Sequence, residues 1–142
     1  MTGPAVTRRP AGWRVGTLAG VPVYLGRSWL VILVVIALVF GPVVRQVVPA
    51  LGTAAYLVAG GFAVLLLLSV LVHEGAHALV GRACGYRVNR IVADFWGGHT
   101  TYDSTDSTPG RSALVAIAGP LANGVLAGLG WLLLQVLPGG VP

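Results

Sequence analysis

Two histidines and one glutamate lie within five residues of one another, in the run His73-Glu74-Gly75-Ala76-His77. On a helix, side chains four residues apart share a face, so both imidazoles can bind one metal ion. Glu74 follows the first histidine, which directs its carboxylate toward a water on the metal and not into the ligand set. Because neutral imidazoles suit zinc, the spacing predicts a zinc site where Glu74 is the general base of a hydrolysis.

A purely structural role is the alternative for the two histidines. Buried imidazoles can form hydrogen bonds to neighbouring helices without any metal. That interpretation leaves Glu74 without a purpose in a very apolar segment, where a buried carboxylate costs about 3 kcal/mol. A bound cation and trapped water would offset this cost, so the residues favour a metal site.

The third protein ligand that a catalytic zinc ion requires is not evident. Cys84 lies about 10 Å along the helix from His77, too far for the two to share one ion. The other candidates follow this helix and would reach the metal only if their segment folded over it, which we do not expect. They are Asp94, His99, Asp103 and Asp106.

The composition is that of a membrane protein. Of the 142 residues, 56% are hydrophobic and 9% charged, and the mean hydropathy is +0.85. A water-soluble domain has about 25% charged residues, so a soluble metalloprotease is excluded. Three stretches are long and apolar enough to cross a bilayer: residues 29–44, residues 47–72 with continuation through the motif, and residues 113–137.

The net charge of +5 comes from nine arginines and no lysine. Four arginines precede the first span, four lie between the second and third, and Arg45 falls between the first two. The positive-inside rule therefore predicts a multi-pass protein of the cell membrane whose N-terminus and residues 82–111 are cytoplasmic. Because the arginines flank spans and do not cluster with stacking aromatics, we expect the lipid bilayer as a partner and no nucleic acid.

The predicted fold is mainly α, a polytopic membrane protein with about three transmembrane helices. Residues 1–13 are expected to form a disordered cytoplasmic tail, and residues 14–142 the membrane domain. Residues 14–25 are rich in β-branched and turn residues, which predicts a short N-terminal strand or a hairpin. We expect Gly41-Pro42 to end or kink the first helix, and the second to run over residues 53–82.

A second β segment is predicted between the second and third helices. Residues 88–103 alternate apolar and polar side chains around Gly97-Gly98, which indicates a membrane-associated β-hairpin or a re-entrant loop. An interfacial loop that only connects the helices is the alternative. In the third helix, Asn123 can orient a ligand or form a hydrogen bond between helices, and the second use is the more frequent.

Three features in this order resemble the site-2 protease family of intramembrane zinc metalloproteases. The first is the pentapeptide on a membrane helix, and the second is a hairpin ending Phe95-Trp96-Gly97-Gly98. The third is Ala118-Gly119-Pro120-Leu121-Ala122-Asn123, at the start of the next span. The resemblance covers most of residues 14–137, which would be the N-terminal part of the catalytic core.

This resemblance implies a Zn²⁺-dependent endopeptidase that cleaves transmembrane segments of single-span membrane proteins in regulated intramembrane proteolysis. In this family His73 and His77 would bind zinc and Glu74 would be catalytic. The substrate would be bound along residues 91–102 and in the next helix, by Phe95, Gly97, Gly98 and Asn123.

The family's third zinc ligand is an aspartate on a later transmembrane helix, in a motif that ends Asp-Gly, and this sequence has no such motif. The chain is therefore expected to be the N-terminal part of a longer protease or a naturally shortened relative. A shortened relative would bind membrane partners or trap substrates without cutting them. A metal transporter is least favoured, because it would place histidines or carboxylates on several spans. The sequence does not indicate the oligomeric state.

Overall fold

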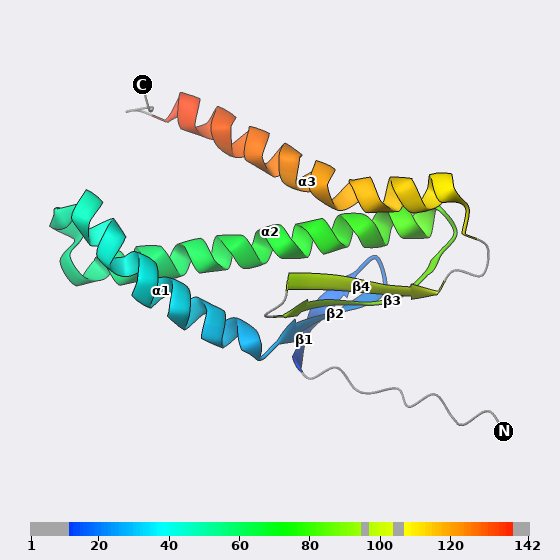
Figure 1. Ribbon diagram of the computed structural model, residues 1–142, viewed down its shortest axis with the longest axis horizontal. Helices are drawn as coiled ribbons and strands as arrows, with labels where there is room; N and C mark the ends of the chain where they lie inside the picture. The colour runs from blue at the N-terminus through cyan, green and yellow to red at the C-terminus, as the bar shows by residue number, and fades with distance from the viewer. Residues whose placement is uncertain (1–11, 95–96, 104–106, 138–142) are drawn as a thin grey trace.

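The computed structural model describes residues 12–94, 97–103 and 107–137. Its helices are α1 (Ser28–Val47), α2 (Ala55–Ala83) and α3 (Pro109–Val136), and the 3₁₀ segment η1 (Pro49–Ala54) joins α1 to α2. Figure 1 shows α2 in the middle of the molecule, with α1 crossing one of its ends. At the other end, α3 and a small sheet lie on opposite sides of α2.

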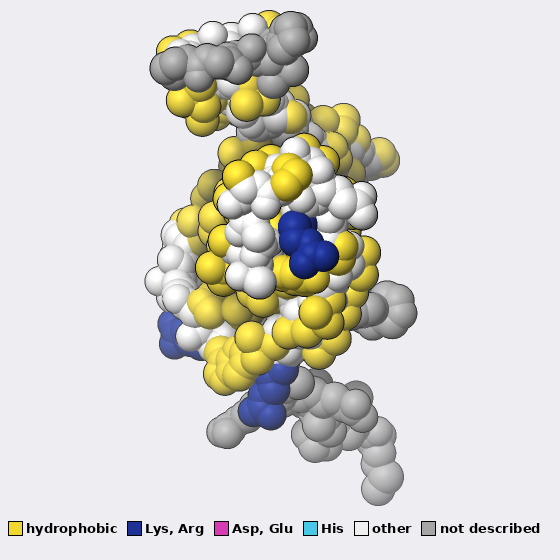
Figure 2. All heavy atoms as spheres, turned by 90° about the vertical axis from the view of Figure 1, so that its left-hand side faces the viewer, with side chains coloured by type: hydrophobic (Ala, Val, Ile, Leu, Met, Phe, Trp, Pro, Cys, Tyr) yellow, Lys and Arg dark blue, Asp and Glu magenta, His cyan; other side chains and the backbone are white. Residues whose placement is uncertain are grey.

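The three helices have the length and apolarity of membrane spans. Their most apolar windows have mean hydropathies of 2.5, 2.5 and 1.7 for α1, for η1 with α2, and for α3. Large apolar side chains along all three helices are exposed, and Figure 2 shows many hydrophobic side chains on the face around the α1–α2 connection. Lipid is the solvent that accommodates such a surface, so the predicted helical membrane protein is confirmed.

The first helix does not end at Gly41-Pro42, since α1 continues to Val47. A proline inside a membrane helix is tolerated where a neighbouring helix packs against it. Here the missing Cβ of Gly41 leaves room for the ring of Tyr56 on α2, whose Cε1 atom would be 2.6 Å from such a Cβ. Close packing between α1 and α2 therefore accompanies the proline.

The sheet contains two hairpins joined in the order β1-β2-β3-β4. Its strands are β1 (Gly12–Leu18), β2 (Val21–Gly26), β3 (Arg87–Asp94) and β4 (Gly97–Asp103). Both hairpins are antiparallel and agree with the predicted β segments. They are joined by parallel pairing of β2 with β3, at Val23 with Ile91 and at the two pairs that follow, and the sequence did not predict this pairing.

One face of the sheet packs against α2 beside the motif. Val21 of β2, Ile91 of β3 and Ala78 of α2 form a buried apolar cluster. Leu18 of β1 lies against Gly75, where a Cβ atom would come within 2.8 Å of Leu18 Cδ2. The small residues of α2 thus let the sheet approach the turn that carries the histidines. The strand β1 begins at Gly12, and residues 1–11 of the predicted tail lie outside the described residues.

Candidate active site

The pentapeptide forms one turn of α2 where that helix is covered by α3 on one side and by β4 on the other. Glu74 is buried, with 6% of its surface exposed. Ligand atoms of His73, Glu74 and His77 all lie within 4.8 Å of one another. The predicted i, i+4 geometry on one helix therefore brings the three side chains together.

The ring of His77 is fixed by the backbone of α3. Its Nδ1 atom is 2.6 Å from the carbonyl oxygen of Val115. A carbonyl oxygen only accepts, so Nδ1 carries the proton and donates it. The neutral ring then presents an unprotonated Nε2, which is the form that binds a metal ion.

The ring of His73 is held by the amide of Asn123, whose side-chain nitrogen lies 3.2 Å from His73 Nδ1. The amide oxygen of Asn123 is 3.3 Å from Ser69 Oγ. Oxygen and nitrogen of an amide are assigned from the surrounding network, and the reversed orientation also satisfies both contacts. In that orientation His73 Nδ1 donates to the amide oxygen, and His73 Nε2 is unprotonated as well.

The distance between the two histidines suits a shared zinc ion. Their Nε2 atoms are 3.1 Å apart, and two nitrogens on one tetrahedral zinc, each at about 2.0–2.1 Å, are separated by about 3.3 Å. The donor set, two imidazoles with a carboxylate beside them, is also one that zinc prefers. The residues present therefore fit a zinc ion.

Space beside the two nitrogens depends on Gly119 of α3. A Cβ atom at this position would collide with Nε2 of both histidines and lie 2.7 Å from His73 Cδ2. In the sequence Gly119 is evident only as part of a motif, whereas the structure shows that its missing side chain makes room for the imidazoles.

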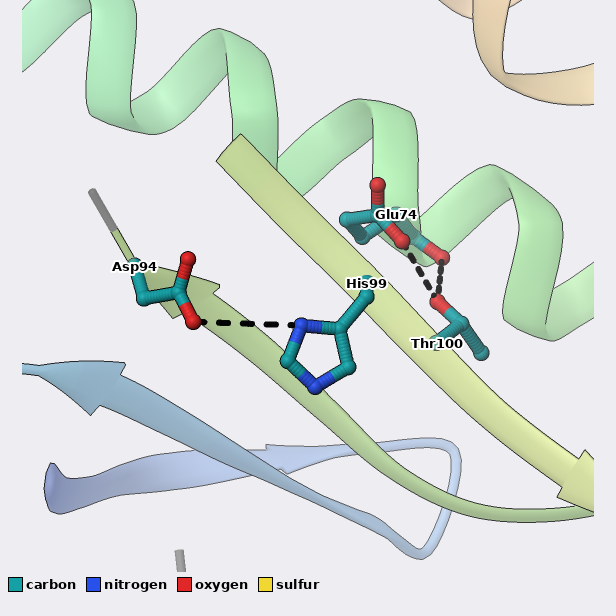
Figure 3. Close-up of polar contacts among 4 residues, drawn as sticks. All are labelled: Glu74, Asp94, His99 and Thr100. Carbon is teal, nitrogen blue, oxygen red and sulfur yellow. Dashed lines mark hydrogen bonds and ion pairs between the residues drawn. The ribbon is translucent and has the colours of Figure 1, made fainter. Parts of the chain in front are cut away.

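Glu74 is positioned by β4. The hydroxyl of Thr100 lies 2.8 Å from Glu74 Oε2 and 3.1 Å from the carbonyl oxygen of Glu74, as Figure 3 shows. Within the described residues Oε1 has no hydrogen bond. The carboxylate is thus held through one oxygen and can accept a proton through the other.

Gly98 permits this approach of β4 to α2. A Cβ atom on Gly98 would collide with Glu74 Cγ and lie 2.8 Å from its Cδ. Side chains alternate along a strand, so Gly98 and Thr100 face α2 on the same side. The close contact between the β4 backbone and the side chain of Glu74 needs a residue without a side chain at this position.

A polar cavity of about 260 Å³ adjoins Glu74 and His77. Hydroxyl groups line much of its wall, contributed by Tyr86, Thr100, Ser107 and Ser112. Such a cavity is wide enough for several water molecules and offers each of them polar partners. The carboxylate of Glu74 is therefore next to a place where the water needed for hydrolysis can be held.

The described candidates for a third ligand do not join the cluster. His99 Nδ1 is 4.0 Å from Asp94 Oδ2, and Figure 3 shows the His99 ring on the side of β4 away from Glu74. Asp103 is exposed and accepts a hydrogen bond of 3.0 Å from Asn89. Asp106 lies outside the described residues, and within them no further His, Cys or carboxylate joins the cluster.

Of the four residues predicted to bind substrate, two lie in contact with motif residues. Asn123 lies against His73, Gly98 lies against Glu74, and Gly97 begins the edge strand β4. Phe95 lies outside the described residues. Two further contacts were missed: Thr100, whose orientation toward α2 follows from the alternation with Gly98, and the carbonyl of Val115, which has no side-chain signature.

Comparisons with known proteins agree with this arrangement. The "Putative zinc metalloprotease sll0528" of Synechocystis is 35% identical over 113 residues, which are 80% of this chain and 30% of that protein. The "Putative zinc metalloprotease Rip3" of Mycobacterium tuberculosis is 34% identical over 110 residues, 77% of this chain and 28% of that protein. This chain thus spans less than a third of the curated relatives that it matches.

The fold also has a solved counterpart. The site-2 protease from Methanocaldococcus jannaschii superposes with a TM-score of 0.64 at 21% identity, covering 89% of this chain and 52% of that one. The model of peptidase family M50 matches residues 61–140, which include the pentapeptide, the second hairpin and α3. With this match over more than half of its residues, the chain belongs to the site-2 protease family, peptidase family M50.

Proposed function

We propose that the protein is a zinc-dependent intramembrane endopeptidase that cleaves transmembrane segments of single-span membrane proteins. The observation that carries this proposal is the arrangement of His73, His77 and Glu74 beside a polar cavity on a helix apolar enough to span a membrane. The names of the two curated relatives support zinc and proteolysis. The zinc ion would be held by Nε2 of both histidines.

A bound zinc ion supplies a Lewis acid that lowers the pKa of a coordinated water to about 7. The residues of the chain do the rest. Glu74 accepts a proton from the attacking water through Oε1 and returns a proton to the leaving amine. Thr100 keeps Oε2 in place, and Val115 and Asn123 keep the two rings oriented.

The third zinc ligand is proposed to come from outside the described residues. His99 lies on the side of β4 away from Glu74 (Figure 3), with its ring 4.0 Å from Asp94, and Asp103 is exposed. A carboxylate from a further segment of the membrane domain would complete the set.

Two surfaces near the motif support an apolar, extended substrate. An apolar cavity of about 530 Å³ runs along the motif turn of α2, with Leu18, Gly75 and Ala76 among its lining residues. The strand β4 is at the edge of the sheet, and an edge strand can pair with an unwound peptide. A membrane segment has the hydrophobicity for the cavity and, once unwound, the backbone groups for the strand.

Membrane proteomics tests this proposal even though the substrate is unidentified. New protein N-termini are mapped by mass spectrometry in membranes of cells that express the full-length wild type, Glu74→Gln or His99→Gln. We expect termini inside transmembrane segments with the wild type and with His99→Gln, whose ring lies outside the site. Appearance of the same termini with Glu74→Gln would overturn the proposed role of Glu74.

A further inference from the structure

A third cavity, of about 390 Å³, lies outside the candidate active site. It is bounded by the turn between β1 and β2, by the last turn of α2 and by the start of β3. We name it the turn pocket; its lining consists of Ala19, Gly20, Val21, Arg82, Tyr86, Arg87 and Val88. Its volume falls within the range of about 300–1,000 Å³ that is usual for small-molecule sites.

Two arginine side chains give the turn pocket a positive charge. The side chains of Arg82 and Arg87 are exposed and line the cavity. Within the described residues neither guanidinium has a hydrogen bond or an ion pair. Asp103 is the cross-strand neighbour of Arg87, but its carboxylate accepts from Asn89. A guanidinium offers a planar fork of donors that matches the oxygens of a phosphate.

The two loop residues of the β1–β2 turn also line this cavity. Its loop residues Ala19 and Gly20 have positive φ angles of 48° and 81°, as in the type I′ turns of tight hairpins. The strand pairing stops at Leu18 with Val21, and neither loop N–H has a backbone partner within the described residues. Arg82 reaches this turn, since its Nη1 atom would be 3.9 Å from a Cβ on Gly20.

The position of the turn pocket relative to the bilayer points to lipid as one source of phosphate. Arg82 is in the last turn of α2, at the end of a candidate span. The 29 residues of α2 extend about 43 Å, which exceeds the hydrocarbon thickness of about 30 Å. At least one end of α2 therefore extends beyond the hydrocarbon. We place the Arg82 end at the level of the lipid headgroups, because an arginine is costly inside hydrocarbon and basic pockets at that level bind anionic lipids.

We propose that the turn pocket binds a phosphate group, through the guanidinium groups of Arg82 and Arg87 and the backbone N–H groups of the β1–β2 turn. The phosphate can belong to an anionic lipid headgroup or be free inorganic phosphate. Binding there would join the first hairpin to the end of the helix that carries the zinc-binding motif. The site is separate from the proposed protease chemistry and does not depend on it.

Native mass spectrometry of the full-length protein in detergent tests this site. Three forms of the protein are compared: the wild type, the pocket variant Arg82→Gln/Arg87→Gln and the control Arg45→Gln/Arg111→Gln. Each is titrated with phosphatidylglycerol, with phosphatidylcholine and with inorganic phosphate. The control removes the same charge from arginines outside the pocket. Each arginine near an anionic headgroup contributes about fivefold, so we expect the pocket variant to bind phosphatidylglycerol about 30-fold more weakly and the control like the wild type.

The outcomes separate the two sources of phosphate. If the wild type binds phosphatidylglycerol more tightly than phosphatidylcholine, the site is assigned to lipid. If it binds inorganic phosphate instead, the site is assigned to the free anion. In either case the pocket variant must bind that ligand more weakly than the wild type. Equal loss in the control, or no phosphate ligand on the wild type, would overturn the proposal. If the double variant does not fold, Arg82→Gln and Arg87→Gln are measured singly, each with an expected loss of about fivefold.

Discussion

The Nε2 atoms of His73 and His77 face each other at 3.1 Å where α2 meets α3. Because His77 Nδ1 donates to the carbonyl of Val115, Nε2 of the neutral His77 ring has no proton. The orientation of the Asn123 amide then determines whether the two rings share a hydrogen bond or can bind a metal ion. If its nitrogen faces His73, His73 Nε2 donates to His77 and the pair is a structural hydrogen bond. If its oxygen faces His73, the Nε2 atoms of both neutral rings lack a proton, and a metal ion between them can bind both.

Substitutions of Asn123 distinguish these two states. An aspartate only accepts, so Asn123→Asp keeps His73 Nδ1 protonated and should retain zinc binding in the full-length protein. Asn123→Leu removes the contact and should weaken zinc binding about 10- to 100-fold, the usual effect of losing the partner of a histidine ligand. Competition with a chelator measures both affinities. Wild-type zinc affinity in Asn123→Leu would show that the amide does not orient the ligand.

A larger residue at Gly119 should disturb the site by steric overlap with the two imidazole rings. A methyl group at this position overlaps both Nε2 atoms, so Gly119→Ala should displace the rings, lower the zinc content and cost about 1–3 kcal/mol of stability through overpacking. Gly124→Ala is the matched control in the same helix, because nothing lies within 4 Å of its Cβ position. It should leave zinc unchanged and add up to about 1 kcal/mol of helix propensity. Equal zinc contents in the two variants would contradict this packing.

The hydroxyl of Thr100 should affect turnover without affecting the metal. Thr100→Val keeps the shape but removes the donor to Glu74 Oε2, and a hydrogen bond to a charged group contributes about 1.5–3 kcal/mol. We therefore expect kcat to fall about 10- to 100-fold at unchanged zinc content, with recovery in Thr100→Ser. Thr101→Val, on the next position of β4, is the control. A loss of zinc in Thr100→Val would show instead that Thr100 supports the fold of the site.

Gly98 should tolerate no side chain beside Glu74, just as Gly119 should tolerate none beside the histidines. Its Cβ position overlaps the side chain of Glu74, so Gly98→Ala should either push β4 away from α2 or turn the carboxylate out of the site. Both results lower activity, while zinc stays on the histidines. Gly60→Ala on α2 is the control, because nothing lies within 4 Å of its Cβ position and Gly60 lines none of the cavities described above. Full activity of Gly98→Ala would refute the close approach of β4.

Local sequence patterns predicted the helices, two β segments for which a hairpin was one of the alternatives, and the proximity of the three motif residues. Each depends on short-range periodicity: His73 and His77 meet because they are one helical turn apart, and the spans follow from runs of apolar residues. Contacts between distant segments could not be predicted in this way. The parallel pairing of Val23 with Ile91 joins residues far apart in the chain and has no turn or spacing signal.

The same distinction applies within the site. The alternation along β4 puts Gly98 and Thr100 on one face, but only the packing of the sheet on α2 shows that this face meets Glu74. Val115 acts through its backbone carbonyl, so its side chain gives no indication of the contact with His77. Residues that position a catalytic group from another element are therefore visible only in the fold.

The zinc content of the full-length protein is the most direct test of the zinc site. It should be measured by inductively coupled plasma mass spectrometry in four forms of the protein: wild type, His73→Gln/His77→Gln, Glu74→Gln and His99→Gln. We predict near-stoichiometric zinc in the wild type, in Glu74→Gln and in His99→Gln, and a loss in the double histidine variant. Zinc that persists without His73 and His77, or is absent from the wild type, would contradict the proposed site.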